Sequence, residues 1–400
     1  MPKPQDALDY LTPATMAEAR PRWRAAAQSG AAWGGFLAWP SIGVGAVVDS
    51  NPFQRRRPGR AEPGLRLTPR LLVERQGGVH ATVLYGAADT QLYPAQPDAD
   101  QLEGRVGVLH DWAPRRDLIL RLQGEVAQVR DRIDNSAAVF GRDRGRPLGT
   151  RDATLAASVQ KTFGLAFATL GGAVSKASFT DGATRGSAST LGLSAQTRTD
   201  VKARFGLPLG PALFVFAEPA ANWRTLDAAP ERSHGTRLVA GLGSERIGLL
   251  GGEVYAGLQR QDYSTRPRPI AEPVFGSRLS WWPSPAWTVS FTVDRALDQA
   301  AVGTPGAPLG TPLDVTREAV TLRAAPSASW SAELDLQHAA LRYLGTARQD
   351  DLLSLDATLV VPWRHDLDLL ADLRLVRLRS SLPAASYGRA VATLGARYRY

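Results

Sequence analysis

A two-residue alternation of apolar and polar side chains constrains the fold of this chain more than any other feature. Between residues 191 and 205, alternate positions carry apolar side chains except at Thr197 and Thr199, and the positions between them include Arg198, Asp200, Lys202 and Arg204. Residues two apart lie on the same face of a β-strand. A helix would scatter these charges around its whole circumference. The alternation therefore predicts strands with one apolar face and one polar face.

The same alternation recurs along the chain and predicts eighteen strands, with ends uncertain by a few residues. These strands cover residues 33–49, 64–76, 79–92, 100–112, 117–131, 152–162, 165–180, 188–206, 211–226, 235–247, 250–264, 273–283, 285–299, 314–325, 328–345, 351–363, 365–380 and 388–400. They make up roughly 60% of the chain, far above the share of strand usual in a soluble domain. A closed transmembrane barrel is the architecture in which that share is expected.

The connections between the predicted strands alternate in length. Gln76-Gly77-Gly78 and Pro283-Ser284 are typical of the tight turns, whereas 50–63, 132–151 and 300–313 are typical of the long loops. Short turns at one end and long loops at the other are characteristic of an outer-membrane barrel. The fold class predicted is all-β: a transmembrane antiparallel up-and-down β-barrel of about 18 strands, with both termini periplasmic.

Residues 25–48 offer an alternative, because this uncharged stretch follows three arginines and is long enough to cross a bilayer as a helix. It contains five glycines and Pro40, however, and its apolar character is weak. An even strand count also requires a strand here, since both termini can lie on the periplasmic side only if the count is even. The domain organisation expected is a periplasmic N-terminal extension over 1–31 and the barrel over 32–400, without a cleavable signal in the chain as given.

Composition excludes several chemistries. The chain has no cysteine, which excludes thiolate catalysis and Cys-ligated zinc, and its five histidines are scattered. It contains no Gly-x-Ser-x-Gly motif, so a serine hydrolase site is not indicated. The mean hydropathy of −0.18 argues against a bundle of transmembrane helices. We expect no enzyme activity, no catalytic residue, no metal site and no cofactor.

Several short motifs resemble one known family. They are Arg20-Pro21-Arg22, the segment Trp33–Ser41, the segment Asp49–Phe53 and the later run Leu279–Pro285. From about residue 19 to 400 the chain resembles the putative β-barrel porin 2 family, outer-membrane β-barrel proteins of exopolysaccharide loci. Val47-Val48 departs from the family pattern, which has an aromatic residue before the Asp-Asn pair. The resemblance implies passage or support of secreted polysaccharide and supplies no catalytic residue.

Charged residues on the polar faces of the strands are the candidates for a pore lining. The densest rows are Arg198, Lys202 and Arg204 on one strand and Asp366, Asp368, Asp372 and Arg374 on another. Walls of mixed charge suit wide polar pores and hydroxyl-rich polymers. A solvated, mutually paired wall without a transport role is the alternative explanation.

Aromatic residues predict where the barrel meets the membrane surface. Those near predicted tight turns are Trp39, Trp112, Trp281, Trp287, Trp330 and Trp363. Tryptophan is common at the membrane interface, which predicts a girdle at the periplasmic side. The C-terminal strand carries Leu394, Tyr398 and Tyr400 on its apolar face, and this pattern resembles the recognition signal read by the barrel-assembly machinery.

Two functions remain open at this level. One is a channel or translocation component for secreted polysaccharide, or a general porin; the other is a plugged, non-conducting barrel that anchors or docks a surface or secretion complex. The loops 132–151 and 300–313 are long enough to fold inward as plugs. The expected partners are outer-membrane lipids and lipopolysaccharide, the barrel-assembly machinery and periplasmic polysaccharide-export proteins. Nucleic acid is not expected, because the excess of 47 basic over 38 acidic residues is spread without a binding motif.

Overall fold

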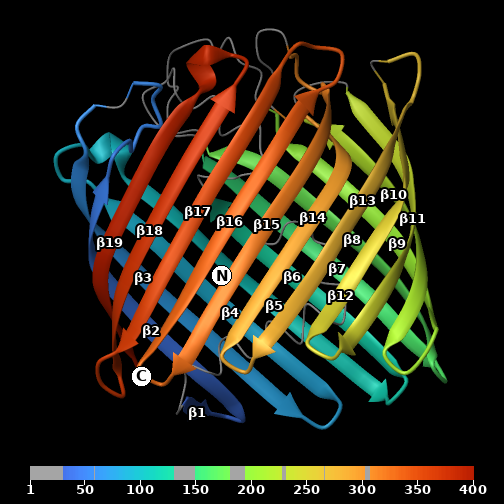
Figure 1. The fold of residues 1–400 in the computed structure, drawn as a ribbon, viewed down its shortest axis with the longest axis horizontal. Coiled ribbons are helices and arrows are strands. Elements are labelled where there is room, and N and C mark those ends of the chain that lie inside the picture. The colour runs from blue at the N-terminus through green and yellow to red at the C-terminus, as the bar shows by residue number, and fades with distance from the viewer. Residues whose placement is uncertain are drawn as a thin grey trace.

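The computed structural model describes residues 30–57, 59–129, 149–180, 194–227, 231–264, 266–301 and 307–400 of the chain. Within these ranges, nineteen strands form one antiparallel sheet. Each strand from β2 to β19 pairs with its neighbours in sequence, and β19 pairs with β2 from Val391–Asp49 to Arg399–Ser41. The sheet therefore closes into an eighteen-strand barrel with tilted strands (Figure 1). This confirms the predicted fold class and strand number.

The strands cover most of the described chain, and two 3-10 turns interrupt the loops at Pro97–Ala99 and Pro383–Ala385. The bounds of the strands are β1 (Ala31–Trp33), β2 (Phe36–Asp49), β3 (Glu62–Gly77), β4 (His80–Leu92), β5 (Gln101–Arg115), β6 (Leu118–Val129), β7 (Gly149–Phe163), β8 (Ala166–Thr180), β9 (Gln196–Pro208), β10 (Leu213–Leu226), β11 (Arg232–Ile247), β12 (Leu250–Tyr263), β13 (Ile270–Ser284), β14 (Trp287–Gln299), β15 (Pro312–Ser327), β16 (Trp330–Tyr343), β17 (Gln349–Pro362), β18 (Leu367–Ser380) and β19 (Tyr387–Arg399).

The N-terminal end of the barrel differs in detail from the predicted strand 33–49. A tight turn at Gly34-Gly35 separates the three-residue β1 from β2, and both glycines have positive φ. A side chain would be strained in that conformation, so the glycine pair ends β1 where the alternation alone suggested one continuous strand. Strand, not helix, is confirmed for residues 36–48 of the candidate signal segment. The predicted extension 1–31 lies almost wholly outside the described residues, as does most of the loop 132–151.

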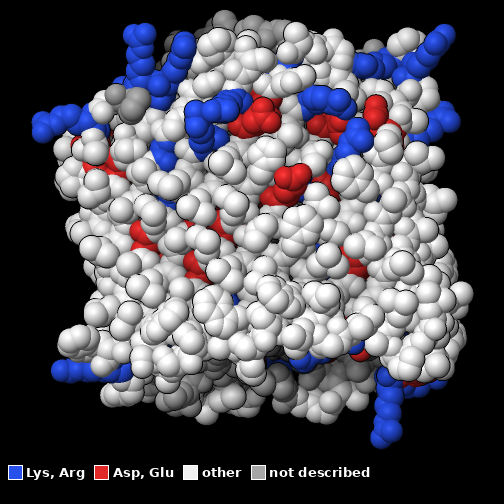
Figure 2. Space-filling model, in the orientation of Figure 1, with Lys and Arg blue, Asp and Glu red and all other residues white. Residues whose placement is uncertain are grey.

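The two faces of the sheet differ as closure in a membrane requires. In β2, Val44 and Val48 point outward and are half exposed, whereas Val47 and Asp49 are fully buried on the inner face. Unpaired backbone groups are costly in hydrocarbon, and closure of the sheet pairs them, while the apolar outer face suits contact with lipid. Figure 2 shows a broad belt of mostly uncharged residues across one side of the barrel, with a few Asp and Glu within it and most Lys and Arg side chains toward its upper and lower margins.

The tight turns lie at one end of the barrel and the long loops at the other (Figure 1). The C-terminus lies at the tight-turn end, where the Tyr400 amide donates a hydrogen bond to the carbonyl of Pro40. The periplasmic placement of this end stays a prediction. None of the helices among the described residues has the length and apolar character needed to cross a membrane.

Candidate functional site in the barrel lumen

The basic row of β9 points into the lumen and is neutralised there by carboxylates of neighbouring strands. Lys202 and Arg204 are buried, while the alternate residues Val201 and Phe205 are exposed on the outer face. The Arg204 guanidinium donates to Glu218 of β10 at 2.6 Å and to Glu253 of β12 at 2.8 Å. Charge-assisted hydrogen bonds of this kind fix the side chains that make them.

The other members of the basic row are paired as well. The Arg198 guanidinium lies 2.7 Å from the Asp200 carboxylate two residues along the same strand, and the Lys202 ammonium lies 3.8 Å from Glu218. Glu253 also has Arg278 of β13 within 3.8 Å. The row is therefore part of a mixed-charge network over β9–β13.

The acidic row of β18 forms a second network with other basic residues, not with the basic row of β9. Asp368 accepts hydrogen bonds from Arg397 at 2.6 Å and from Arg399 at 2.7 Å, both from β19. Arg374 lies 3.4 Å from the Asp356 carboxylate of β17. Asp366, predicted to lie within this strand, belongs instead to the turn before β18, which begins at Leu367. Its carboxylate lies 3.7 Å from His365.

Asp372, the remaining member of the acidic row, is bound by an arginine that lies three strands away in the sheet. Arg66 of β3 donates to Asp89 of β4 at 2.6 Å and to Asp372 at 3.0 Å. To do so its side chain crosses the inner faces of β2 and β19, where Gly45 and Gly395 are paired. Glycine leaves this part of the wall without side chains, which lets a long guanidinium lie across it.

The wall itself divides between β13 and β14 toward the long-loop end. These strands pair only as far as Phe275 and Arg295. Beyond that point β13 stays paired with β12 as far as Ile270, and β14 stays paired with β15 as far as Gln299. The ends of β14 and β15, with the described residues of the loop between them, therefore separate from β13. We call residues 296–301 and 307–315 the inward hairpin.

Leu297 shows that this hairpin folds into the lumen. The alternation places Leu297 on the outward face of β14 with Phe291, yet it is 1% exposed. Its amide donates to the Gln259 carboxamide at 3.0 Å, and its carbonyl accepts from Arg224 at 3.0 Å. Both partners point inward, from β12 and β10, so the outer face of the hairpin lies against the inner wall of β10–β12.

Further polar contacts hold the hairpin against this wall. The Tyr263 hydroxyl donates to the carbonyl of Asp298, and the Ser233 hydroxyl donates to Gln299. The Arg224 guanidinium lies 3.3 Å from the Asp298 carboxylate. In the loop, the Ala301 carbonyl accepts from the amide of Ser194, just before β9.

The opposite face of the hairpin packs on an apolar cluster. Leu313 and Val315 are buried among residues that point inward from the far wall, with Ala300 and Ala307 of the loop in the same cluster. The cluster members on the far wall are Ala339, Leu341, Tyr343, Leu352, Val376, Leu378 and Tyr387. The hairpin is thus held between β10–β12 on one side and β16–β19 on the other, and it narrows the lumen at the long-loop end.

Loops close over the hairpin and beside it. The Arg266 guanidinium, from the loop after β12, donates to the Leu344 carbonyl at 2.6 Å and so spans the divided part of the wall. Where β2 and β19 pair, Asp49 accepts from Arg389 at 2.7 Å and from the Tyr93 hydroxyl at 3.0 Å, all three being buried. Burial and the neighbouring Asp49 carboxylate raise the pKa of Tyr93 above its usual value.

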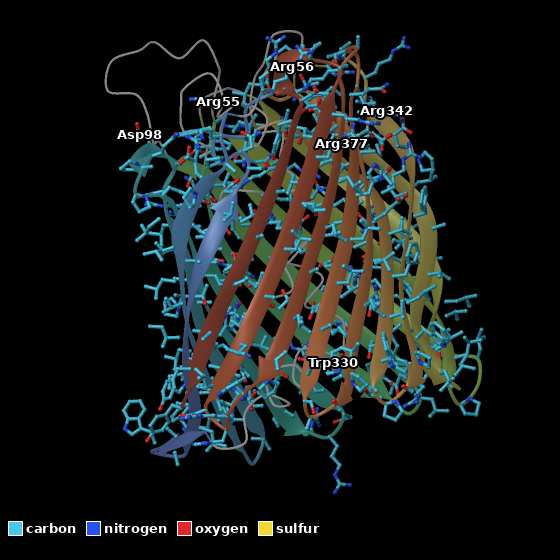
Figure 3. The ribbon with its side chains drawn as sticks, turned by 60° about the vertical axis from the view of Figure 1, so that its left-hand side comes forward. Arg55, Arg56, Asp98, Trp330, Arg342 and Arg377 are labelled. Carbon is cyan, nitrogen blue, oxygen red and sulfur yellow. The ribbon has the colours of Figure 1, made fainter. Side chains whose placement is uncertain are left out.

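The predicted membrane-interface tryptophans do not all share one face. Trp112, Trp281, Trp287 and Trp363 are exposed on the outside near the tight turns, and Trp330 is partly exposed at the same end (Figure 3). Trp39 instead shares the inner face of β2 with Val47 and Asp49 and pairs with the buried Leu72. Odd-numbered residues of β2, such as Val47 and Asp49, face inward, so Trp39 points away from lipid.

The residues predicted as an assembly signal share the outer face of the closing strand. Leu394, Tyr398 and Tyr400 are each about half exposed or more. Arg342 and Arg377 are outward at the opposite, long-loop end of the barrel (Figure 3). The outer surface therefore carries aromatic side chains at one margin and guanidinium groups at the other.

The histidines lie mostly outside the lumen. His80 and His110 are 3.4 Å apart on the outer face, where the His80 ring stacks on Trp112. His338 lies on the outer face of β16, 3.4 Å from Glu318 and 3.8 Å from Asp351. The described part of the chain contains no cluster of three or more His, Cys, Asp or Glu suited to a metal ion.

Sequence reasoning missed the inward hairpin as a wall element and the residues that hold it, Arg224 and Gln259. Loop 300–313 was expected to be long enough to fold inward, but the alternation of β14 continues to its end without a break. The sequence shows only an arginine on the polar face of a strand, and nothing in it indicates that Arg224 is buried.

Comparison with known proteins gives one family match. The sequence model of the family described as Putative beta-barrel porin 2 matches residues 24–400. No match was found among curated proteins. Among solved structures, the siderophore receptor PirA from Pseudomonas aeruginosa is 11% identical with a TM-score of 0.44, covering 91% of this chain and 80% of that one. The outer-membrane protein OpdK from the same species is 12% identical with a TM-score of 0.44, covering 91% and 99%.

Proposed function

The chain belongs to the putative beta-barrel porin 2 family, integral barrels of the Gram-negative outer membrane, and from this premise we propose that it is a channel for secreted polysaccharide. In this proposal the polymer passes along the paired charges of the lumen, and the inward hairpin narrows the long-loop mouth. The tight-turn end faces the periplasm, where export proteins deliver the polymer.

The observation that carries the proposal is the pairing of charges on the inner wall. Arg204 is held between two carboxylates and Asp368 between two guanidinium groups. Such a wall offers many hydrogen-bond donors and acceptors while holding little net charge at any one place. A neutral or weakly charged chain of hydroxyl-bearing sugars can exchange hydrogen bonds along it, whereas a bare ion finds no site of a single sign.

The experiment is conductance of the purified full-length protein in planar bilayers, with reversal potential measured under a salt gradient. Replacing Lys202 and Arg204 by Gln should shift selectivity toward cations, and replacing Asp368 and Asp372 by Asn should shift it toward anions. If wild type conducts and neither pair of substitutions moves the reversal potential, these residues do not line the conducting path.

The inward hairpin favours a second candidate function, a plugged barrel that anchors or docks a surface or secretion complex. It is held from both walls, by Arg224 and Gln259 on one side and by an apolar cluster on the other. A wild-type barrel that never conducts, together with a variant lacking residues 300–311 that does, would favour this candidate over an open channel. Lipopolysaccharide would then be an outer-surface partner, through outward arginines such as Arg342 and Arg377.

A further inference from the structure

One row of residues across the inner wall alternates aromatic side chains with glycine. Each member is the direct cross-strand partner of the next, from β8 to β13. The row is Phe167, Gly206, Phe216, Gly241, Tyr255 and Gly276. Phe214 faces Gly243 in the adjoining row, and Trp282 of β13 lies against Gly251.

The glycines let the aromatic rings lean onto the wall. A Cβ atom built on Gly206 would lie 2.2 Å from the Phe167 ring, and one on Gly243 would lie 2.2 Å from the Phe214 ring. One on Gly276 would lie 2.3 Å from the Tyr255 hydroxyl. Each substitution would push a ring off the neighbouring backbone, so the glycines are seats for the rings.

Phe167, Phe214 and Phe216 form a connected surface of rings near the tight-turn mouth of the lumen. Phe167 and Phe214 are the second residues of β8 and β10, and their rings meet edge to face with centroids 5.5 Å apart. Phe214 and Phe216 follow at 6.2 Å. Successive aromatic positions of the row are two strands apart, or roughly 10 Å, from the usual spacing of paired strands.

Charged and polar groups border the rings. The Arg204 guanidinium lies over the Phe216 ring at 4.3 Å, and Arg237 lies over Tyr255 at 5.2 Å. The Tyr255 hydroxyl donates to Asp294 at 2.7 Å. Phe216 is covered by its arginine, whereas Phe167, Phe214, Tyr255 and Trp282 remain partly exposed.

We infer that Phe167, Phe214, Tyr255 and Trp282 form an aromatic track that binds sugar rings. The hydroxyl groups of the sugars form hydrogen bonds with Arg204, Glu218, Arg237 and Asp294. A pyranose has a face of C–H groups that stacks on an aromatic ring and an edge of hydroxyls that bonds to guanidinium and carboxylate groups. Apolar surfaces with a few fixed polar groups are the usual composition of a ligand site. This inference rests on the proposed function and names where the polymer is first held.

The test is equilibrium binding of neutral linear hexaoses of glucose, one α-1,4-linked and one β-1,4-linked, to the full-length barrel in detergent micelles by isothermal titration calorimetry. The double variant F214L/W282L removes two rings of the track. The control F275L/W281L makes the same two changes on β13, at outward residues that are half exposed. A second variant, F214Y/W282F, keeps a ring at both positions.

We expect wild type and the control to bind at least one hexaose, and F214L/W282L to bind it at least about tenfold more weakly, equivalent to about 1.4 kcal/mol. F214Y/W282F should bind nearly as wild type, which separates loss of the rings from loss of the fold. Retention of heat-modifiable mobility on gels checks that each variant is a folded barrel.

Either of two results would overturn the inference: no binding of either hexaose by wild type, or equal binding by wild type and F214L/W282L. Ion current is measured separately on the same proteins. A barrel that binds hexaoses through the track but never conducts would refute the channel while supporting the track. A barrel that conducts but binds hexaoses equally well as wild type and as F214L/W282L would refute the track while leaving the channel supported.

Discussion

Replacing Arg224 by Met should release the inward hairpin and raise channel opening. The Arg224 side chain is 1% exposed, donates to the Leu297 carbonyl at 3.0 Å and lies 3.3 Å from the Asp298 carboxylate. Methionine keeps much of the apolar stem but removes the charge and the donors. The hairpin then loses its polar contact with β10 while its contacts with β11 and β12 remain.

The size of the effect follows from these contacts. A hydrogen bond to a charged group contributes about 1.5–3 kcal/mol to stability, and loss of a fully buried ion pair costs about 3–5 kcal/mol. Asp298 is 26% exposed and keeps Arg317 at 3.8 Å, so the smaller range, about 1.5–3 kcal/mol, applies. A loss of about 2 kcal/mol shifts the balance between inward and released hairpin roughly 30-fold.

The assay is single-channel recording in planar bilayers, with open probability compared between wild type and R224M. The matched control is R260M. Arg260 lies near the long-loop end of β12, as Arg224 does on β10, but it is exposed outside the barrel and lies 3.8 Å from Asp262. An exposed pair of this kind is worth about 1 kcal/mol or less, so R260M should behave as wild type. Unchanged open probability in R224M, with the barrel folded, would refute the role of the hairpin in narrowing the lumen.

Three further outcomes are expected. Arg204→Gln should destabilise the barrel by about 3 kcal/mol, because Glu218 loses its closest cation, and the double variant R204Q/E218Q should recover part of that loss in urea unfolding. Burial without a hydrogen-bond partner raises the pKa of Glu231, which lies outside the strands. The barrel is therefore most stable when this carboxyl is protonated, and its stability falls as pH rises through the raised pKa. Glu231→Gln should raise the unfolding temperature at pH 8 more than at pH 4. Tyr400→Asp should lower the amount of heat-modifiable barrel in outer-membrane fractions, and a normal amount would count against a C-terminal assembly signal.

The barrel and the faces of its strands were predictable from the sequence because the strand period is two and a membrane wall has two unlike sides. Val201 and Phe205 had to face lipid once Lys202 and Arg204 faced water, and backbone hydrogen bonding in hydrocarbon then required closure. Strand ends were less predictable. Asp366 was predicted within a strand but lies in a turn, and the Gly34-Gly35 turn separates β1 from β2. Turn conformation depends on a few local residues, and the alternation of apolar and polar side chains does not reveal it.

Trp39 was assigned by its distance from a turn, and only the parity of the folded strand shows that it points inward. The sequence thus determined the number of strands, their faces and the closed wall, since each follows from local period and from the cost of unpaired backbone groups. The tertiary structure alone decided the register at which neighbouring strands pair. The alternation of β14 puts Leu297 on the lipid side, but contacts from Arg224 and Gln259 across the lumen hold it inside. In the same way, the row from Phe167 to Gly276 exists only because six separate strands align, and no single strand carries the information that sets that register.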